Sequence, residues 1–293
     1  MYLIFDTETT GLPKRWDAPA SATDNWPRCV QIAWQLHDEM GGLIEQFDTL
    51  VRPEGFNIPY DSEQIHGIST DLSMREGKPL REVLEAFEHT LGKTHFLVGQ
   101  NVGFDINVMG AEFFRVLGQN PLEGFPVLDT CTEDTAELCR LPGGRGGKFK
   151  LPTLTELHQH LFGEPFEEAH NASADVEATT RCFLELIRRK SFSPDDLKVA
   201  TDYFEKFNKA NPDPIALLGL NHQNLKKASE ELAAAKSEPD AGLSRSEIEE
   251  NKKAMEGAVF AHLHNHTQFS VLQSTIKMKD LVAATAAHGM PAV

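Results

Sequence analysis

The chain has 293 residues, about twice the size of a common single domain, and its 40% hydrophobic and 25% charged residues are typical of a folded globular protein. No apolar run approaches the roughly 18 residues of a membrane span, and the first residues lack a basic leader, so we expect a cytoplasmic protein without membrane contact. The net charge of −16 argues against capture of nucleic acid by a positive surface, although bound divalent cations can invert the field of a carboxylate cluster.

Strand-like and helix-like stretches alternate from residue 1 to about residue 190, which predicts an α/β domain. In chain order, we expect strands at residues 3–5, 30–34 and 47–51, a helix at 80–91, a strand at 96–98, a helix ending near 117, a strand at 125–128, and helices from about 153 and 172. From residue 191 to residue 257 the chain is polar, helix-prone and interrupted by prolines, which favours a solvated helical linker.

Two acids follow the first apolar strand. Side chains two residues apart lie on the same face of a strand, so Asp6 and Glu8 should project together. At about 6.6 Å and an effective dielectric near 20, their repulsion is about 2.5 kcal/mol, which implies a compensating cation or a raised pKa. The alternative is a strand end at which both acids simply enter solvent.

Three further residues can join these acids. Asp105 follows a predicted strand at the start of a helix, the edge at which open α/β sheets bind ligands, although it could be an ordinary helix cap. Asp175 falls on the border of the apolar stripe of the last predicted helix. His170 precedes that helix, and an ordinary imidazole pKa of about 6.5 suits a general base.

These motifs, in this order, resemble the DEDDh 3′–5′ exonuclease family, which includes the proofreading epsilon subunits of bacterial DNA polymerase III. The resemblance covers residues 1–190 and rests on Asp6 to Leu12, His66 to Ile68, Asn101 to Asp105, and His170 to Asp175. It implies a ribonuclease H-like fold, in which a five-stranded mixed sheet is flanked by helices.

The resemblance also implies a mechanism. Asp6, Glu8 and Asp175 would hold one Mg²⁺ or Mn²⁺ ion, Asp6 and Asp105 would hold a second, and His170 would act as the general base in hydrolysis of the terminal phosphodiester. The expected substrate is the single-stranded 3′ end of DNA.

Four other residues would contact that strand. As in the family, Thr10 and Leu12 would bracket the terminal nucleotide, and His66 and Asn101 would lie along the strand path. Leu12 could equally be a core residue, and Asn101 could equally form a turn.

Residues 258–293 resemble the start of the PHP domain that opens a bacterial replicative polymerase alpha subunit, with His264 and His266 as the implied metal ligands. Because the sequence stops at Val293, we expect this truncated piece to have no metal chemistry of its own. The fusion implies proofreading beside the DNA polymerase III alpha subunit, in the same polypeptide, with other replisome subunits as partners. An RNA-trimming exonuclease and a catalytically silent assembly module remain alternatives.

Overall fold

A mixed sheet of five strands forms the centre of the computed structural model, which describes residues 1–166 and 171–236 together with residues 282, 286 and 287. Its order is β3-β2-β1-β4-β5. Strand β2 runs antiparallel to both β1 and β3, β4 is parallel to β1, and β5 is parallel to β4. The strands are β1 (Tyr2–Thr9), β2 (Cys29–His37), β3 (Leu43–Leu50), β4 (Phe96–Gly99) and β5 (Val127–Asp129). The expected five-stranded mixed sheet is confirmed.

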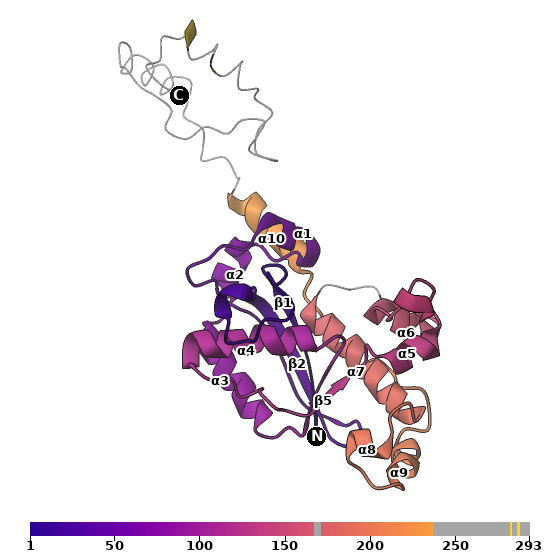
Figure 1. The fold of residues 1–293 in the computed structure, drawn as a ribbon. Coiled ribbons are helices and arrows are strands. Elements are labelled where there is room, and N and C mark those ends of the chain that lie inside the picture. Colours follow the sequence, from indigo (N-terminus) through magenta and orange to yellow (C-terminus); the bar gives the residue numbers. More distant parts are fainter. Residues whose placement is uncertain (167–170, 237–281, 283–285, 288–293) are drawn as a thin grey trace. The chain divides into compact units, whose positions relative to one another are not determined.

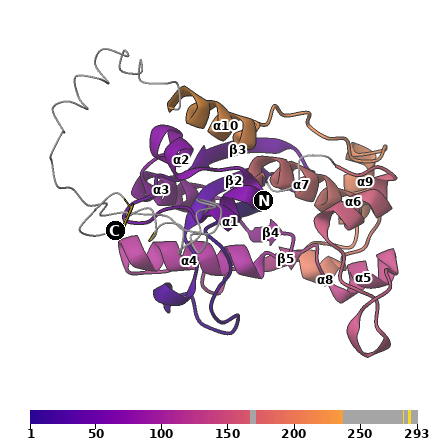
Figure 2. The same cartoon turned by 90° about the horizontal axis from the view of Figure 1, so that it is seen from above.

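Alternation along β1 divides the interior into two layers. Leu3 and Phe5 belong to the core under α3 (Leu80–Leu91) and α4 (Gly103–Leu117). Tyr2 and Ile4 belong to the opposite core, under α7 (Ala172–Arg188). Helices therefore cover both faces of the sheet, with α3 and α4 on one side and α7 on the other (Figures 1 and 2).

Several short helices lie between the predicted elements. They are α1 (Tyr60–His66), α2 (Thr70–Glu76), α5 (Glu133–Cys139) and α6 (Leu154–Phe162), with single 3-10 turns at η1 (Thr23–Asn25) and η2 (Arg145–Gly147). Of these, only α6 was expected from the sequence. A seven-residue helix such as α1 completes less than two full turns, too few to display a clear apolar period.

Residues 191–236 differ from the expected solvated connector. They form α8 (Pro194–Leu197), α9 (Tyr203–Ala210) and α10 (Leu225–Lys236), and they belong to one compact unit with residues 1–190. Their buried apolar residues join the α7 core or, for Leu225, a cluster beside α2; they are Leu197, Tyr203, Phe204, Phe207 and Leu225. Charged neighbours masked this apolar pattern in the sequence.

The predicted boundaries at residues 190 and 257 stay predictions, and residues 237–257 of the expected linker lie outside the described part of the chain. His264 and His266 also lie outside it. Among the described residues, no helix combines the length and apolar character needed to cross a bilayer.

Candidate active site

Three carboxylates meet where β1 ends beside the first turn of α7. Asp6 and Glu8 continue the α7-facing side of β1, and Asp175 comes from α7 itself. One carboxylate oxygen from each residue lies within 4.8 Å of the others. The structure thus brings together three of the four acids that the sequence singled out, and their role in catalysis stays a prediction. His170 lies outside the described residues.

The cluster is electrostatically unfavourable without a cation. Burial, followed by the neighbouring carboxylates, raises the pKa of Asp6 well above its ordinary value. Burial and the charges of Asp175 and Asp105 raise the pKa of Glu8 to about 8. Ionising the cluster at neutral pH therefore costs free energy, which a bound divalent cation would offset.

Asp105 stands next to this group and is held from the other face of β1. Its Oδ1 accepts hydrogen bonds from the Thr7 amide at 3.0 Å and the Thr7 hydroxyl at 2.6 Å. Burial raises the pKa of Asp105 to about 7, while the two bonds from Thr7 oppose that rise. Asp105 is outside the group of three, yet after burial its charge contributes most to the raised pKa of Asp6.

Sequence reasoning overlooked Thr7. In the Asp-Thr-Glu triplet, alternation along the strand places the threonine opposite the two acids, on the side of α4. The signal was therefore present in the same strand pattern that paired Asp6 with Glu8.

It also overlooked Asp129, at the end of β5. The Asp129 carboxylate accepts hydrogen bonds from the amides of Asn101 at 2.8 Å, Val102 at 3.0 Å and Cys131 at 2.7 Å. These bonds fix the turn from β4 into α4, the helix that carries Asp105. Asp129 follows a strand at the same sheet edge as Asp105, which is the signal that could have found it.

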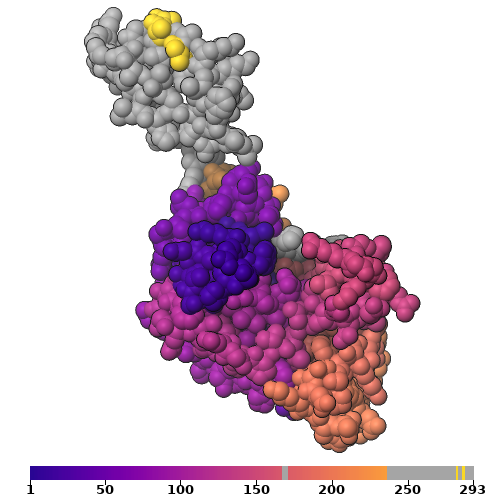
Figure 3. Space-filling view, viewed as in Figure 1, coloured from indigo at the N-terminus to yellow at the C-terminus, as the bar shows by residue number. Residues whose placement is uncertain are grey.

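Leu12 projects into solvent. It is 73% exposed, so the alternative of a core residue is wrong. Thr10 is tied back to the sheet, because its amide donates to the Arg28 carbonyl and its hydroxyl accepts from the Arg28 amide, each at 2.9 Å. In Figure 3 an indigo patch shows that the N-terminal part of the chain reaches the surface, although Tyr2 to Phe5 are buried.

The two remaining predicted residues differ in environment. His66 is buried at the end of α1, and its Nδ1 accepts from the Ile68 amide at 3.1 Å. Asn101 is exposed and has a φ of 58°, a left-handed conformation that asparagine tolerates. Asn101 thus forms the turn that was considered as its alternative, and it also remains accessible to a ligand.

Comparisons with known proteins agree with this geometry. Residues 3–183 match the family model described as exonuclease, and residues 262–293 match that of the PHP domain. Members of the exonuclease family depend on divalent metal ions.

The similar curated proteins are DNA polymerases. The chain is 30% identical over 228 residues to the PolC-type DNA polymerase III of Streptococcus thermophilus, covering 78% of this chain and 13% of that protein. It is 25% identical over 234 residues to the PolC-type DNA polymerase III of Staphylococcus aureus, covering 77% of this chain and 14% of that protein. The chain thus spans about one seventh or less of the length of these relatives.

Solved structures show the same fold. E. coli exonuclease I in complex with a dA16 oligonucleotide aligns with a TM-score of 0.50 and 21% identity, covering 67% of this chain and 42% of that one. A second structure of exonuclease I aligns with a TM-score of 0.51 and 23% identity over the same shares. The sheet, the acidic cluster and the family match all point to the same family. The chain belongs to the exonuclease family.

Proposed function

We propose that this chain removes nucleotides from the 3′ end of single-stranded DNA and serves as the proofreading part of a DNA polymerase III. The observation that carries the proposal is the approach of Asp6, Glu8 and Asp175 to within 4.8 Å of one another. The PolC-type relatives and the PHP match support the link to a polymerase in the same polypeptide, next to other replisome subunits.

The donor set fits hard divalent cations. All the candidate ligands are carboxylate oxygens, the ligands that Mg²⁺ and Mn²⁺ prefer. In this proposal, Asp6, Glu8 and Asp175 hold one ion, and Asp6 and Asp105 hold a second. When bound, the pair supplies Lewis-acid stabilisation to the attacking and leaving oxygens.

The protein's own groups orient the strand and move the proton. Leu12 packs against the terminal nucleotide beside Thr10, and His66 and Asn101 lie along the strand. His170 removes a proton from the attacking water. Attack on phosphorus breaks the bond to the 3′ oxygen of the preceding nucleotide and releases a nucleoside 5′-monophosphate. The leaving oxygen takes up a proton from solvent water and becomes the new 3′ hydroxyl.

The acidic surface favours a tethered enzyme. With a net charge of −16, the chain attracts a polyanion poorly unless another domain presents the strand. We propose that the exonuclease domain, extended beyond its predicted end at residue 190 by the packed helices up to residue 236, continues through a linker to residue 257 and then into a PHP domain. Covalent attachment would replace electrostatic capture by a high effective concentration.

Release of mononucleotides from 3′-labelled primers tests this function. Primers with a paired or a mispaired end, and an RNA of the same length, are incubated with Mg²⁺ or Mn²⁺. We expect metal-dependent release of 5′-monophosphates from the 3′ end of DNA, faster from the mispaired end. Much faster degradation of the RNA would contradict the proofreading assignment.

Substitution of one acid tests the site. Asp6→Asn keeps the shape of the side chain and should reduce the rate by at least about 100-fold, since one residue serves both proposed ions. Asp195→Asn, on the exposed surface of α8, is the matched control and should leave the rate unchanged. Equal rates for both variants would refute the assignment of the site.

A further inference from the structure

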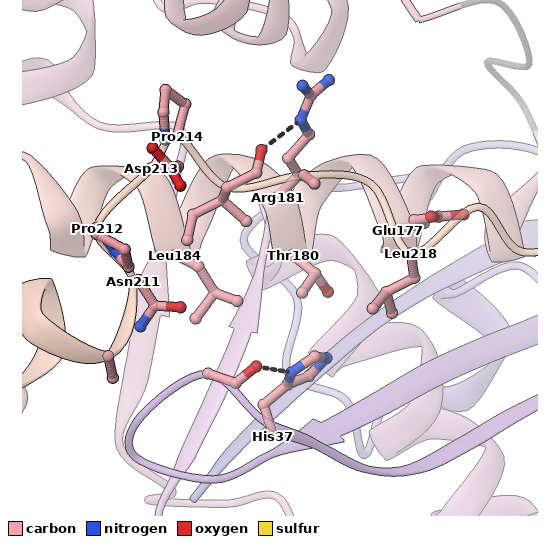
Figure 4. A pocket seen from close by; sticks show the side chains of 14 residues that line it. His37, Glu177, Thr180, Arg181, Leu184, Asn211, Pro212, Asp213, Pro214 and Leu218 are labelled. Carbon is pink, nitrogen blue, oxygen red and sulfur yellow. Dashed lines mark hydrogen bonds between the residues drawn. The ribbon is translucent and has the colours of Figure 1, made fainter.

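A segment that follows α9 lies along α7, the helix that carries Asp175. We call residues 215–223 the strap. The strap lies beyond residues 3–183, the part of the chain that matches the exonuclease family. Figure 4 shows where this part of the chain runs beside α7, with Arg181 hydrogen-bonded to the main chain of the strap.

A polar stripe on α7 holds the strap. Glu177, Arg181 and Glu185 are spaced four residues apart and so share one face of the helix. Arg181 Nε donates to the Ile215 carbonyl at 2.8 Å, and the Ile215 amide donates to Glu185 Oε2 at 3.2 Å. Two side chains of the helix therefore bind the main chain at the start of the strap.

The end of the strap is bound by Glu177. This carboxylate accepts from the Gly219 amide at 2.7 Å, the Leu220 amide at 3.3 Å and His222 Nε2 at 2.8 Å. The side chains of His222 and Glu177 are only 10% and 6% exposed. Removal of one partner would leave the other in a site shielded from water, which is costly.

His222 continues this network into the first turn of α7. Its Nδ1 is hydrogen-bonded to Ser173 Oγ at 2.9 Å, and Ser173 Oγ donates to Asn171 Oδ1 at 2.9 Å. Asn171, the N-cap of the helix, also donates to the Gln223 carbonyl at 2.9 Å. The strap is therefore hydrogen-bonded to Asn171 and Ser173, which flank the first residue of α7.

The sheet also binds the first turn of α7, through Gln31 of β2. Gln31 Nε2 donates to Asn171 Oδ1 at 3.2 Å, and Gln31 Oε1 accepts from the Ala172 amide at 3.2 Å. Gln31 is the β2 partner of Glu8 in the sheet register. The start of α7 is thus positioned relative to Glu8 by Gln31 on one side and by the strap on the other.

Cavities flank the strap, and one of its apolar residues packs on the α7 core. Cavities of about 310 Å³ each lie beside the strap, one lined by Leu218 and the other by Leu217. Ile215 packs against the α7 core, so apolar packing adds to the polar bonds that hold the strap.

We propose that the strap is part of the exonuclease, and that His222 is a positioning residue that fixes the first turn of α7 and thereby Asp175 opposite Asp6 and Glu8. This inference rests on the proposed function of the acidic cluster. Loss of His222 would free one side of the turn, so that Asp175 would spend less time in the position that binds a cation.

The test compares His222→Ala with three other variants of the full chain. His222→Gln keeps a donor for Glu177 and should restore most of the wild-type behaviour. Ser173→Ala breaks the link between His222 and the N-cap, together with the hydrogen bond from Ser173 to Asp48. His89→Ala, on the exposed surface of α3, is the matched histidine control.

Three measurements are made on each variant. Calorimetry gives the Kd of Mn²⁺ without substrate, hydrogen exchange gives the protection of amides in the first turn of α7, and the primer assay gives kcat and KM. We expect His222→Ala to weaken Mn²⁺ binding and lower kcat by about tenfold each, the lower end for residues that orient metal ligands, with KM little changed. Exchange in the first turn should become faster, and Ser173→Ala should change in the same direction.

Unchanged Mn²⁺ affinity and exchange in both His222→Ala and Ser173→Ala would overturn the inference. If His222→Ala does not fold, Ser173→Ala decides the question alone. A wild-type protein that lacks exonuclease activity would instead refute the proposed function, so the two failures are distinguishable.

Discussion

The hydrogen bond from the Thr7 hydroxyl to Asp105 allows a quantitative test of the site. Thr7→Val keeps the size of the side chain and the main-chain bond to Asp105, and it removes only the hydroxyl bond of 2.6 Å. A hydrogen bond to a charged group contributes about 1.5–3 kcal/mol, which corresponds to a pKa change of about 1–2 units. The pKa of Asp105, about 7 in the intact site, should therefore rise.

The consequence is a shift of the pH profile. Because the ionised carboxylate is the form that binds a cation, activity should increase with pH through this pKa, and the variant should need a higher pH. We expect the rate at pH 7 to fall by about 5- to 50-fold and to recover near pH 9, from the same free energy. A bound cation lowers the pKa in both proteins, so the profiles are compared at one fixed, subsaturating Mn²⁺ concentration.

Single-turnover release of the terminal nucleotide between pH 6 and pH 9.5 measures the shift. Thr49→Val is the matched control, since this buried threonine of β3 donates its hydroxyl to the Leu50 carbonyl. If activity rises with pH over the same pH range in Thr7→Val and in the wild type, the role assigned to Thr7 is refuted. A uniform loss of rate at every pH would also do so.

Four more expectations concern stability and substrate contact. In metal-free protein, folding raises the pKa of Glu8 to about 8, so the stability present at low pH should be lost as pH rises from about 5 to 8. Thermal unfolding should show this decline, and Mn²⁺ should raise the Tm most at pH 8. Asp6→Asn should raise the metal-free Tm at pH 8 by a few degrees, because one repelling charge is removed; an unchanged Tm would argue against repulsion. Leu12→Ala should raise the KM for single-stranded DNA by roughly tenfold through lost apolar contact, with no change in Tm. Phe204→Ala should cost about 3–5 kcal/mol in urea unfolding, and a cost below about 1 kcal/mol would contradict its burial in the α7 core.

Local chemistry determined much of the fold in advance. The apolar residues of β1 and the helical spacing over residues 80–91 identify their elements without tertiary information, because strand and helix periods are properties of the backbone. The same alternation placed Asp6 and Glu8 on one face. Short elements such as α1 escaped detection, since seven residues carry too little of the period.

The sequence singled out the acids as candidate ligands, but only the tertiary structure brings them together. Asp175 reaches Glu8 because α7 packs on the even-numbered side of β1, and Asp105 reaches Thr7 across 98 positions of chain. Such distances depend on how the layers pack, which no local pattern encodes.

The strap is the clearest case of this difference. In the sequence, residues 215–223 lie within the stretch 191–257, which as a whole is polar and interrupted by prolines and favours a connector. Their function as a brace for α7 depends on partners such as Glu177, 45 positions from His222. The sequence by itself determined which side chains could bind a cation, since that depends on residue chemistry and on the period of one strand or helix. Only the tertiary structure decided how these side chains are held, because contacts between residues far apart in the chain exist only after the core has packed.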